Sequence, residues 1–140
     1  MIITSKNNPK IKRFRSFKDR LPSKEKEYFC IEGTHLLEEL ISAEILPSEL
    51  IATEEWMSKN QKIREKFDSS LISTVSREAL TSSITTKSPD GVAALVRKSE
   101  IKQFHYQKNN NFVLVLDRVQ DPGNLGNLFR TALAGGVDGV

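Results

Sequence analysis

Residues 112–140 read FVLVLDRVQDPGNLGNLFRTALAGGVDGV, and this stretch decides how the chain is organised. Its first part, FVLVL, is a short apolar run that predicts a buried strand over 112–116. Turn residues follow at 121–123, and apolar residues then recur at positions i, i+3, i+4, i+7 and i+8. These positions hold Leu125, Leu128, Phe129, Ala132 and Leu133. The pattern predicts a strand, a polar loop and an amphipathic helix that stops at the glycines 135–136.

Such a unit offers a ligand the free N–H groups of a helix N-terminus. Gly123 and Gly126 are spaced G-x-x-G, which matches neither the dinucleotide-binding nor the phosphate-binding glycine pattern. The glycine spacing therefore disfavours a nucleotide-binding α/β enzyme.

The run LDRVQDPGNLGNLFRTA over 116–132 resembles the first motif of the SpoU (TrmH-like) RNA ribose 2′-O-methyltransferases. These are trefoil-knotted SPOUT-class enzymes that use S-adenosylmethionine. Residues 3–12 (ITSKNNPKIK), 29–33 (FCIEG) and 88–92 (SPDGV) resemble the substrate-binding domain that often precedes the knot. The resemblance implies a three-layer α/β/α RNA-binding domain, similar to a ribosomal-protein fold, followed by the first strand-loop-helix of an α/β knot domain.

The later motifs of that family do not occur in these 140 residues. We therefore expect an N-terminal fragment with an RNA-binding domain at 1–98, a linker at 99–111 and an incomplete methyltransferase domain at 112–140. It should bind RNA, with ribosomal RNA as the expected substrate, but neither bind S-adenosylmethionine nor catalyse alone. The intact enzyme should be a homodimer through the missing knot. The alternative is a non-catalytic RNA-binding module of ribosomal-protein type.

The resemblance assigns catalysis to Arg130, with Asn124 organising the loop. An arginine stays protonated, so a direct role and a role through a bound phosphate both remain open. Six positions along a helix correspond to a rotation of about 240°, so the two residues share no face unless Asn124 lies in the cap.

The net charge of +3 is unevenly distributed, because residues 1–26 hold nine basic and two acidic residues. Asn8 and Pro9 predict a helix start, and the region 8–20 then alternates cations with an apolar stripe. We expect the stripe to dock and the cations to face outward and bind RNA, although a solvated charged face is the plainer interpretation. The candidate RNA-binding cations here are Lys6, Lys10, Lys12, Arg13 and Arg15.

The middle of the chain alternates predicted strands with predicted helices. Strands are expected at 27–31, 49–53, 71–75 and 91–96, and helices are expected to start at Thr34, Ser58 and Ser76. This alternation predicts a mainly parallel sheet with helices on both faces.

Two places in this domain are further RNA-binding candidates. Glu32 ends the first predicted strand, and Lys87 lies in the polar loop TTKSPD at 85–90. At Glu32-Gly33 a tight strand-to-helix turn that needs glycine is the favoured explanation, whereas the loop at 85–90 fits an ordinary turn and an RNA contact equally well. Trp56 and Tyr106 could stack on bases, but single aromatic residues more often pack in a core.

Other functional classes find little support. No segment approaches the roughly 18 uninterrupted apolar residues of a membrane span, so a cytoplasmic protein is expected. Cys30 lies in an apolar run, which favours an inert thiol over a nucleophile. His35 and His105 lack the Cys or carboxylate spacing of a metal site, so no metal is expected.

Overall fold

The computed structural model describes residues 1–19, 27–101, 105, 107–109 and 111–140. The chain forms two compact units, Met1–Ile101 (unit 1) and Lys102–Val140 (unit 2). No helix of the described residues is long and apolar enough to cross a membrane.

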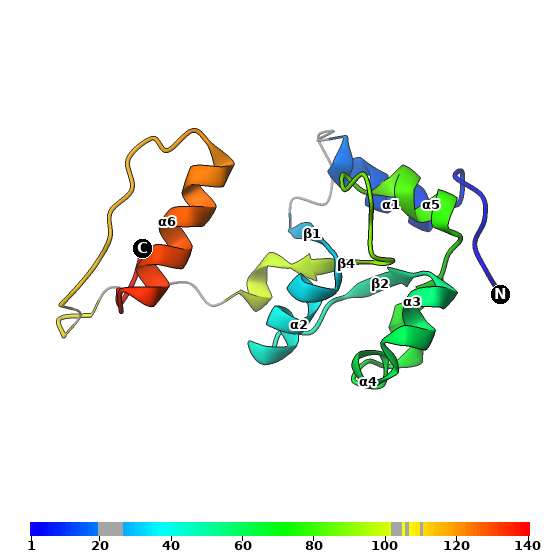
Figure 1. The fold of residues 1–140 in the computed structure, drawn as a ribbon, viewed down its shortest axis with the longest axis horizontal. Helices are drawn as coiled ribbons and strands as arrows, with labels where there is room; N and C mark the ends of the chain where they lie inside the picture. Colours follow the sequence, from blue (N-terminus) through cyan, green and yellow to red (C-terminus); the bar gives the residue numbers. More distant parts are fainter. Residues whose placement is uncertain (20–26, 102–104, 106, 110) are drawn as a thin grey trace. The chain divides into compact units, whose positions relative to one another are not determined.

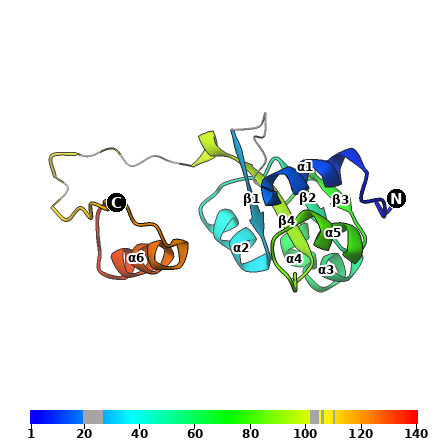
Figure 2. The same ribbon diagram turned by 90° about the horizontal axis from the view of Figure 1, so that it is seen from above.

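Unit 1 (Figure 1) is built on a four-stranded sheet with the strand order β1-β4-β2-β3, which Figure 2 shows from above. Its strands are β1 (Tyr28–Glu32), β2 (Glu49–Ala52), β3 (Ile72–Thr74) and β4 (Val92–Arg97). Among these four strands, β2 and β3 pair in parallel, whereas β4 runs antiparallel to both β1 and β2. The prediction of a mainly parallel sheet is therefore wrong. Alternation of strands and helices along the chain predicts layers, but it does not reveal that the last strand inserts between the first two.

The sheet is buried on both faces because alternate residues of β4 enter two different cores. Val92, Ala94 and Val96 belong to one cluster, and Ala93 and Leu95 belong to the other. All five are at most 1% exposed. Continuous burial of this kind explains why the strand is apolar without alternation.

Two layers of helices cover these faces, one above and one below the sheet in the view of Figure 1. On one face, α2 (Thr34–Ser42) and α3 (Glu54–Lys59) contribute to the first core. On the other, α1 (Pro9–Lys18) and α5 (Arg77–Ser83) contribute to the second. The predicted three-layer α/β/α arrangement is confirmed. Shorter helical segments are α4 (Gln61–Arg64), η1 (Ser69–Leu71) and η2 (Lys98–Glu100).

The start of α1 agrees with the sequence-based expectation. The Asn8 side chain accepts a 2.9 Å hydrogen bond from the backbone N–H of Lys10, and Pro9 is the first helical residue. Ser76 caps α5 in the same way through the N–H of Ala79. The predicted end of the first helix at residue 20 lies outside the described residues, and α1 ends at Lys18.

Two other predicted caps are wrong. Thr34 is the first residue of α2, and the cap position is occupied by Gly33, which has no side chain to contribute. Ser58 lies inside α3 and donates to the backbone oxygen of Glu54, so it does not start a new helix. Phe67 follows α4 and is buried in the first core.

Unit 2 contains the predicted helix as α6 (Pro122–Ala134), which ends at Gly135 as expected. The predicted strand over 112–116 does not form. Among the described residues of unit 2, an isolated β-bridge joins Val113 to Gly139, and no longer ladder is present. Without neighbouring strands the apolar run has no sheet to join, and Val115 is 83% exposed.

Candidate functional site

The carboxyl end of β1 is joined to the loop 85–90 through one side chain. Oε1 of Glu32 accepts hydrogen bonds of 2.7 and 2.8 Å from the backbone N–H and hydroxyl of Thr85. Oε2 accepts bonds of 2.8 and 2.6 Å from the same two groups of Thr86. Partial burial raises the pKa of Glu32, but these four bonds outweigh it and hold the pKa below its ordinary value. The carboxylate therefore stays ionised and fixes the start of the loop.

The other end of the same loop is tied to the start of α2. Oδ2 of Asp90 accepts a 2.7 Å hydrogen bond from the backbone N–H of Thr34, one of the free donors of that helix. Gly33 precedes it with a φ of 99°, a conformation that glycine adopts readily. The two sequence motifs at 29–33 and 88–92 thus meet in space.

Behind this junction lies Trp56, which is 2% exposed. Its indole N–H donates a 2.7 Å hydrogen bond to the hydroxyl of Thr34. A Cβ at Gly91, whose φ is 119°, would lie 2.8 Å from Cβ of Trp56, so this position requires glycine. Trp56 is a packing residue and is not available to stack on a base, whereas Tyr106 lies outside the described residues.

Between the two tied ends of the loop, Lys87 and Ser88 are exposed. Pro89 beside them is buried, which further limits the path of the backbone. The loop therefore presents a lysine to solvent from a position that Glu32 and Asp90 define.

The cations of α1 do not all face outward, which corrects the sequence-based expectation. Nη1 of Arg13 lies 2.6 Å from Oε2 of Glu49, and Nζ of Lys10 lies 3.2 Å from its Oε1. Glu49 is 8% exposed at the start of β2. The Arg13 guanidinium also lies 5.1 Å from the ring centroid of Tyr28. These two cations attach the helix to the sheet.

Arg15 likewise bonds within unit 1. Its Nε donates to the backbone oxygen of Ser82, and its Nη2 donates to the Ser82 hydroxyl and the carbonyl of Lys6 at 3.0–3.1 Å. Lys6 and Lys12 themselves are exposed. Among the five cations predicted to bind RNA in this region, these two remain directed to solvent.

In unit 2, Arg130 and Asn124 are both exposed on α6. Asn124 lies inside the helix, where its N–H donates a 2.7 Å hydrogen bond to the side chain of Asp121, the N-cap. Nη2 of Arg130 donates at 2.6 Å to Oδ1 of Asn127, and its guanidinium lies over Gly126. Because Asn124 is not the cap, about 240° of rotation separates it from Arg130, and the structure does not bring the two together.

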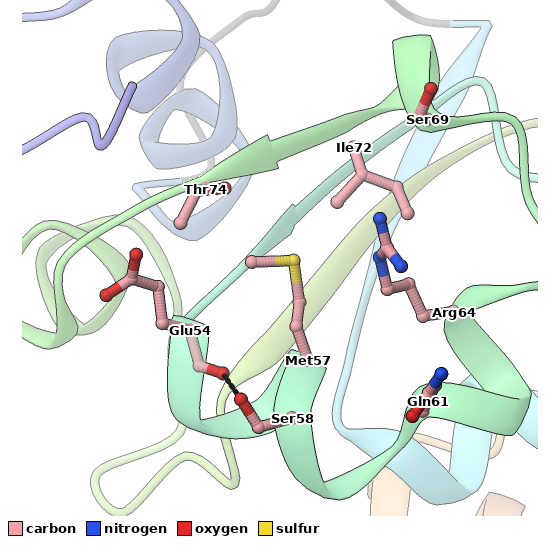
Figure 3. A pocket seen from close by; sticks show the side chains of 8 residues that line it. All are labelled: Glu54, Met57, Ser58, Gln61, Arg64, Ser69, Ile72 and Thr74. Atoms are coloured by element: carbon pink, nitrogen blue, oxygen red, sulfur yellow. Dashed lines mark hydrogen bonds between the residues drawn. The ribbon is translucent and has the colours of Figure 1, made fainter.

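A hollow of about 610 Å³ opens beside α3, α4 and β3 (Figure 3). Its lining residues are Glu54, Met57, Ser58, Gln61, Arg64, Ser69, Ile72 and Thr74. No residue predicted to act in binding or catalysis lines it. Across the described ranges, no group of three or more His, Cys, Asp or Glu side chains could hold a metal ion.

Cys30 is half-buried in β1, next to Glu32. Burial and the Glu32 charge raise the pKa of its thiol to about 12, so the thiol stays protonated. This agrees with the expectation of an inert side chain.

Sequence reasoning missed the acids that organise these surfaces. Asp90 lay within the motif SPDGV, and its place before a glycine that follows a polar loop was an available signal. No sequence signal indicated the role of Glu49, because an acid at the start of a short strand is most often solvent-exposed.

The family model of the MRM3-like substrate binding domain matches residues 8–94. An uncharacterized tRNA/rRNA methyltransferase of Synechocystis is 34% identical over 99% of this chain and 51% of its own length. The 23S rRNA (guanosine(2553)-2'-O)-methyltransferase RlmP of Bacillus subtilis is 32% identical over 99% of this chain and 52% of its own. The chain thus spans about half the length of the curated relatives it matches.

Solved structures agree with these matches. A crystal structure of an RNA 2'-O ribose methyltransferase is 28% identical, with a TM-score of 0.77, over 99% of this chain and 54% of that one. An AdoMet-bound rRNA methyltransferase from Sinorhizobium meliloti is 25% identical with a TM-score of 0.76, over 99% of this chain and 52% of that one.

Proposed function

Because this chain belongs to the MRM3-like substrate binding domain family, we propose that it forms the RNA-binding half of an RNA ribose 2′-O-methyltransferase. Ribosomal RNA is the proposed substrate, in line with the names of the relatives. A cytoplasmic location and a dimeric intact enzyme belong to the same proposal.

The observation that carries the proposal is the loop tied by Glu32 and Asp90. It combines two sequence motifs from distant parts of the chain into one surface and exposes Lys87 there. A lysine on an ordered loop suits a phosphate, because the ammonium is a compact charge with three donors.

The N-terminal segment adds positive charge to unit 1. Residues 1–26 carry nine basic and two acidic residues, and among those described Lys6 and Lys12 are directed to solvent. We propose that these two contact RNA phosphates, whereas Lys10, Arg13 and Arg15 act mainly by holding α1 in place. Binding should then weaken strongly with salt, because each phosphate contact releases counterions.

Unit 2 supplies the proposed catalytic side chain. When bound, S-adenosylmethionine would supply the methyl group to the ribose 2′-oxygen and leave as S-adenosylhomocysteine, and the proton of the 2′-hydroxyl would pass to solvent. An arginine side chain offers hydrogen-bond donors and no acceptor, so Arg130 holds the hydroxyl or a neighbouring phosphate and does not remove the proton itself. Asn124 shapes the start of the helix.

The described residues of unit 2 do not by themselves fit S-adenosylmethionine. Ala132 is the one buried hydrophobic residue among them, and Phe129 and Leu133 are 47% and 83% exposed. A cofactor of that size needs an enclosed, largely apolar pocket.

A filter-binding titration with a structured ribosomal RNA fragment tests the RNA-binding function. We expect weak, salt-dependent binding that Lys6→Glu with Lys12→Glu reduces strongly. The matched control reverses Lys62 and Lys66, which are also exposed and lie on or next to α4, and should change the affinity little. Reversal of Arg13 or Arg15 would disturb α1 and is not a clean test. Absence of RNA binding by the wild-type chain would overturn the proposal.

A further inference from the structure

We propose that Glu32 does not contact RNA but is the positioning residue that sets the loop 85–90 so that Lys87 meets a phosphate. This rests on the proposed RNA-binding function and assigns roles within the same surface. It replaces the expectation from sequence that Glu32 is itself a contact.

The hydrogen-bonding capacity of Glu32 is already filled. A carboxylate has about four lone-pair positions. Two donors from Thr85 occupy one oxygen, and two donors from Thr86 occupy the other, all at 2.6–2.8 Å. An amino group of a base would have to displace one of these bonds, and an RNA phosphate would be repelled by the charge.

The bonds of Glu32 act on a loop that is also fixed at its far end. Asp90 accepts the N–H of Thr34 at 2.7 Å, and Pro89 is buried. Only Lys87 and Ser88 lie exposed between the anchored residues. The backbone at Lys87 is thus ordered before RNA arrives, and binding does not have to order it.

The direction in which Glu32→Gln changes the RNA affinity therefore distinguishes the two roles of Glu32. If Glu32 contributed only its negative charge, Glu32→Gln would strengthen RNA binding by removing a repulsion. If it positions Lys87, Glu32→Gln weakens binding, because an amide nitrogen cannot accept from the N–H groups of Thr85 or Thr86.

A double-mutant cycle on the whole chain, titrated with a structured ribosomal RNA fragment at several salt concentrations, tests the proposal. We expect Lys87→Ala to lower the affinity about three- to tenfold and to reduce the salt slope by about one. Glu32→Gln should weaken binding by a similar factor, and the double variant should be no weaker than Lys87→Ala alone.

Amide exchange at Thr85 and Thr86 provides the second measurement. It should accelerate in Glu32→Gln while the amides of β4 stay protected, which shows that unit 1 remains folded. Glu38→Gln makes the same charge change at an exposed position of α2 and should alter neither exchange nor affinity.

Three results would overturn the proposal. These are tighter binding by Glu32→Gln, a Glu32→Gln effect that persists in full in the Lys87→Ala background, and wild-type affinity for Lys87→Ala. In each of them the wild-type chain still binds RNA, so the proposed function survives. Loss of RNA binding by the wild type itself would instead overturn both.

Discussion

Arg13 and Glu49 form a 2.6 Å ion pair that ties the N-terminal helix to the start of β2. Glu49 is 8% exposed, and its carboxylate also contacts Lys10 at 3.2 Å. Apolar contacts hold the same helix, since Ile11 and Phe14 are fully buried against α5 and the sheet. The most basic part of the chain is thus partly neutralised by an acid from the middle of the sequence.

The first prediction concerns the stability of this attachment. Glu49→Gln should lower the free energy of unfolding, because it removes the buried charge that both Lys10 and Arg13 contact. Loss of one member of a fully buried ion pair costs about 3–5 kcal/mol. Because Lys10 and Arg13 are partly exposed and solvent screens their charges, we expect a smaller cost of about 1–3 kcal/mol. Urea denaturation measures the change. Glu39→Gln, at an exposed site on α2, is the control, and an equal loss in both variants would contradict the role of Glu49.

The second prediction is a pH dependence of the loop 85–90. The pKa of Glu32 lies below the ordinary value of 4.5, so the carboxylate stabilises the folded loop fully above that pH. The contribution is lost as the pH falls through the folded pKa, below 4.5. Amide protection at Thr85 and Thr86, corrected for intrinsic exchange, should therefore fall on acidification.

The same measurement on Glu32→Gln is the control, because this side chain does not titrate and its low protection should not change with pH. Wild-type protection that stays constant between about pH 6 and about pH 3 would show that the carboxylate does not hold the loop.

Local patterns in the sequence predicted the elements better than their arrangement. The family resemblance is confirmed by the match over residues 8–94 and by the relatives. Helices with a strong cap, such as those after Asn8 and Ser76, were correctly placed because the cap is a local interaction. The order of the strands was not, because the pairing of β4 between β1 and β2 is a long-range property that periodicity does not encode.

The same contrast between local and long-range information holds for the candidate RNA-binding residues. Candidate residues in the motifs were identified by type, but their partners were not. Arg13 and Arg15 were expected to face solvent, because nothing in the sequence indicates that Glu49 and Ser82 lie opposite them. Glu32 was expected to contact RNA, and only the structure shows four hydrogen bonds to the loop.

The third prediction concerns the dynamics of unit 2. Phe129 and Leu133 of α6 are 47% and 83% exposed, whereas Val92 and Leu95 of β4 are at most 1% exposed. A helix that buries little apolar surface opens at low cost. We expect faster amide exchange across α6 than across β4 in dilute solution, measured by mass spectrometry.

Helix α1 is the matched control for α6, because it has a similar length but a buried stripe. It should exchange more slowly than α6. Equal protection of the two helices in a dilute monomer would mean that α6 is stabilised by contacts other than those described.

The fourth prediction is that this 140-residue chain shows no detectable binding of S-adenosylmethionine by calorimetry. The physical reason is the exposure of Phe129 and Leu133 on α6, since a cofactor pocket would bury such apolar side chains. A full-length relative serves as the positive control. Micromolar binding to this chain would show that it contains a cofactor site after all.

The last prediction concerns Arg130 in a protein of the relatives' length that contains this chain. Arg130→Ala should lower the single-turnover rate of RNA methylation by at least about 10²-fold with both ligands saturating, the range for a lost electrostatic contribution. RNA affinity should change little. Arg130→Lys should rescue poorly, because an ammonium does not reproduce the planar fork of a guanidinium.

Asn127→Ala separates positioning of Arg130 from its charge. It removes the 2.6 Å hydrogen bond to the guanidinium but keeps the cation, so its rate should fall between those of the wild type and Arg130→Ala. Asn124→Ala keeps the backbone N–H that donates to Asp121, so the helix start should persist, and any fall in turnover would report contacts of the Asn124 side chain itself. A near wild-type rate for Arg130→Ala would remove Arg130 from the mechanism. Its hydrogen bond to Asn127 would then have a structural role only.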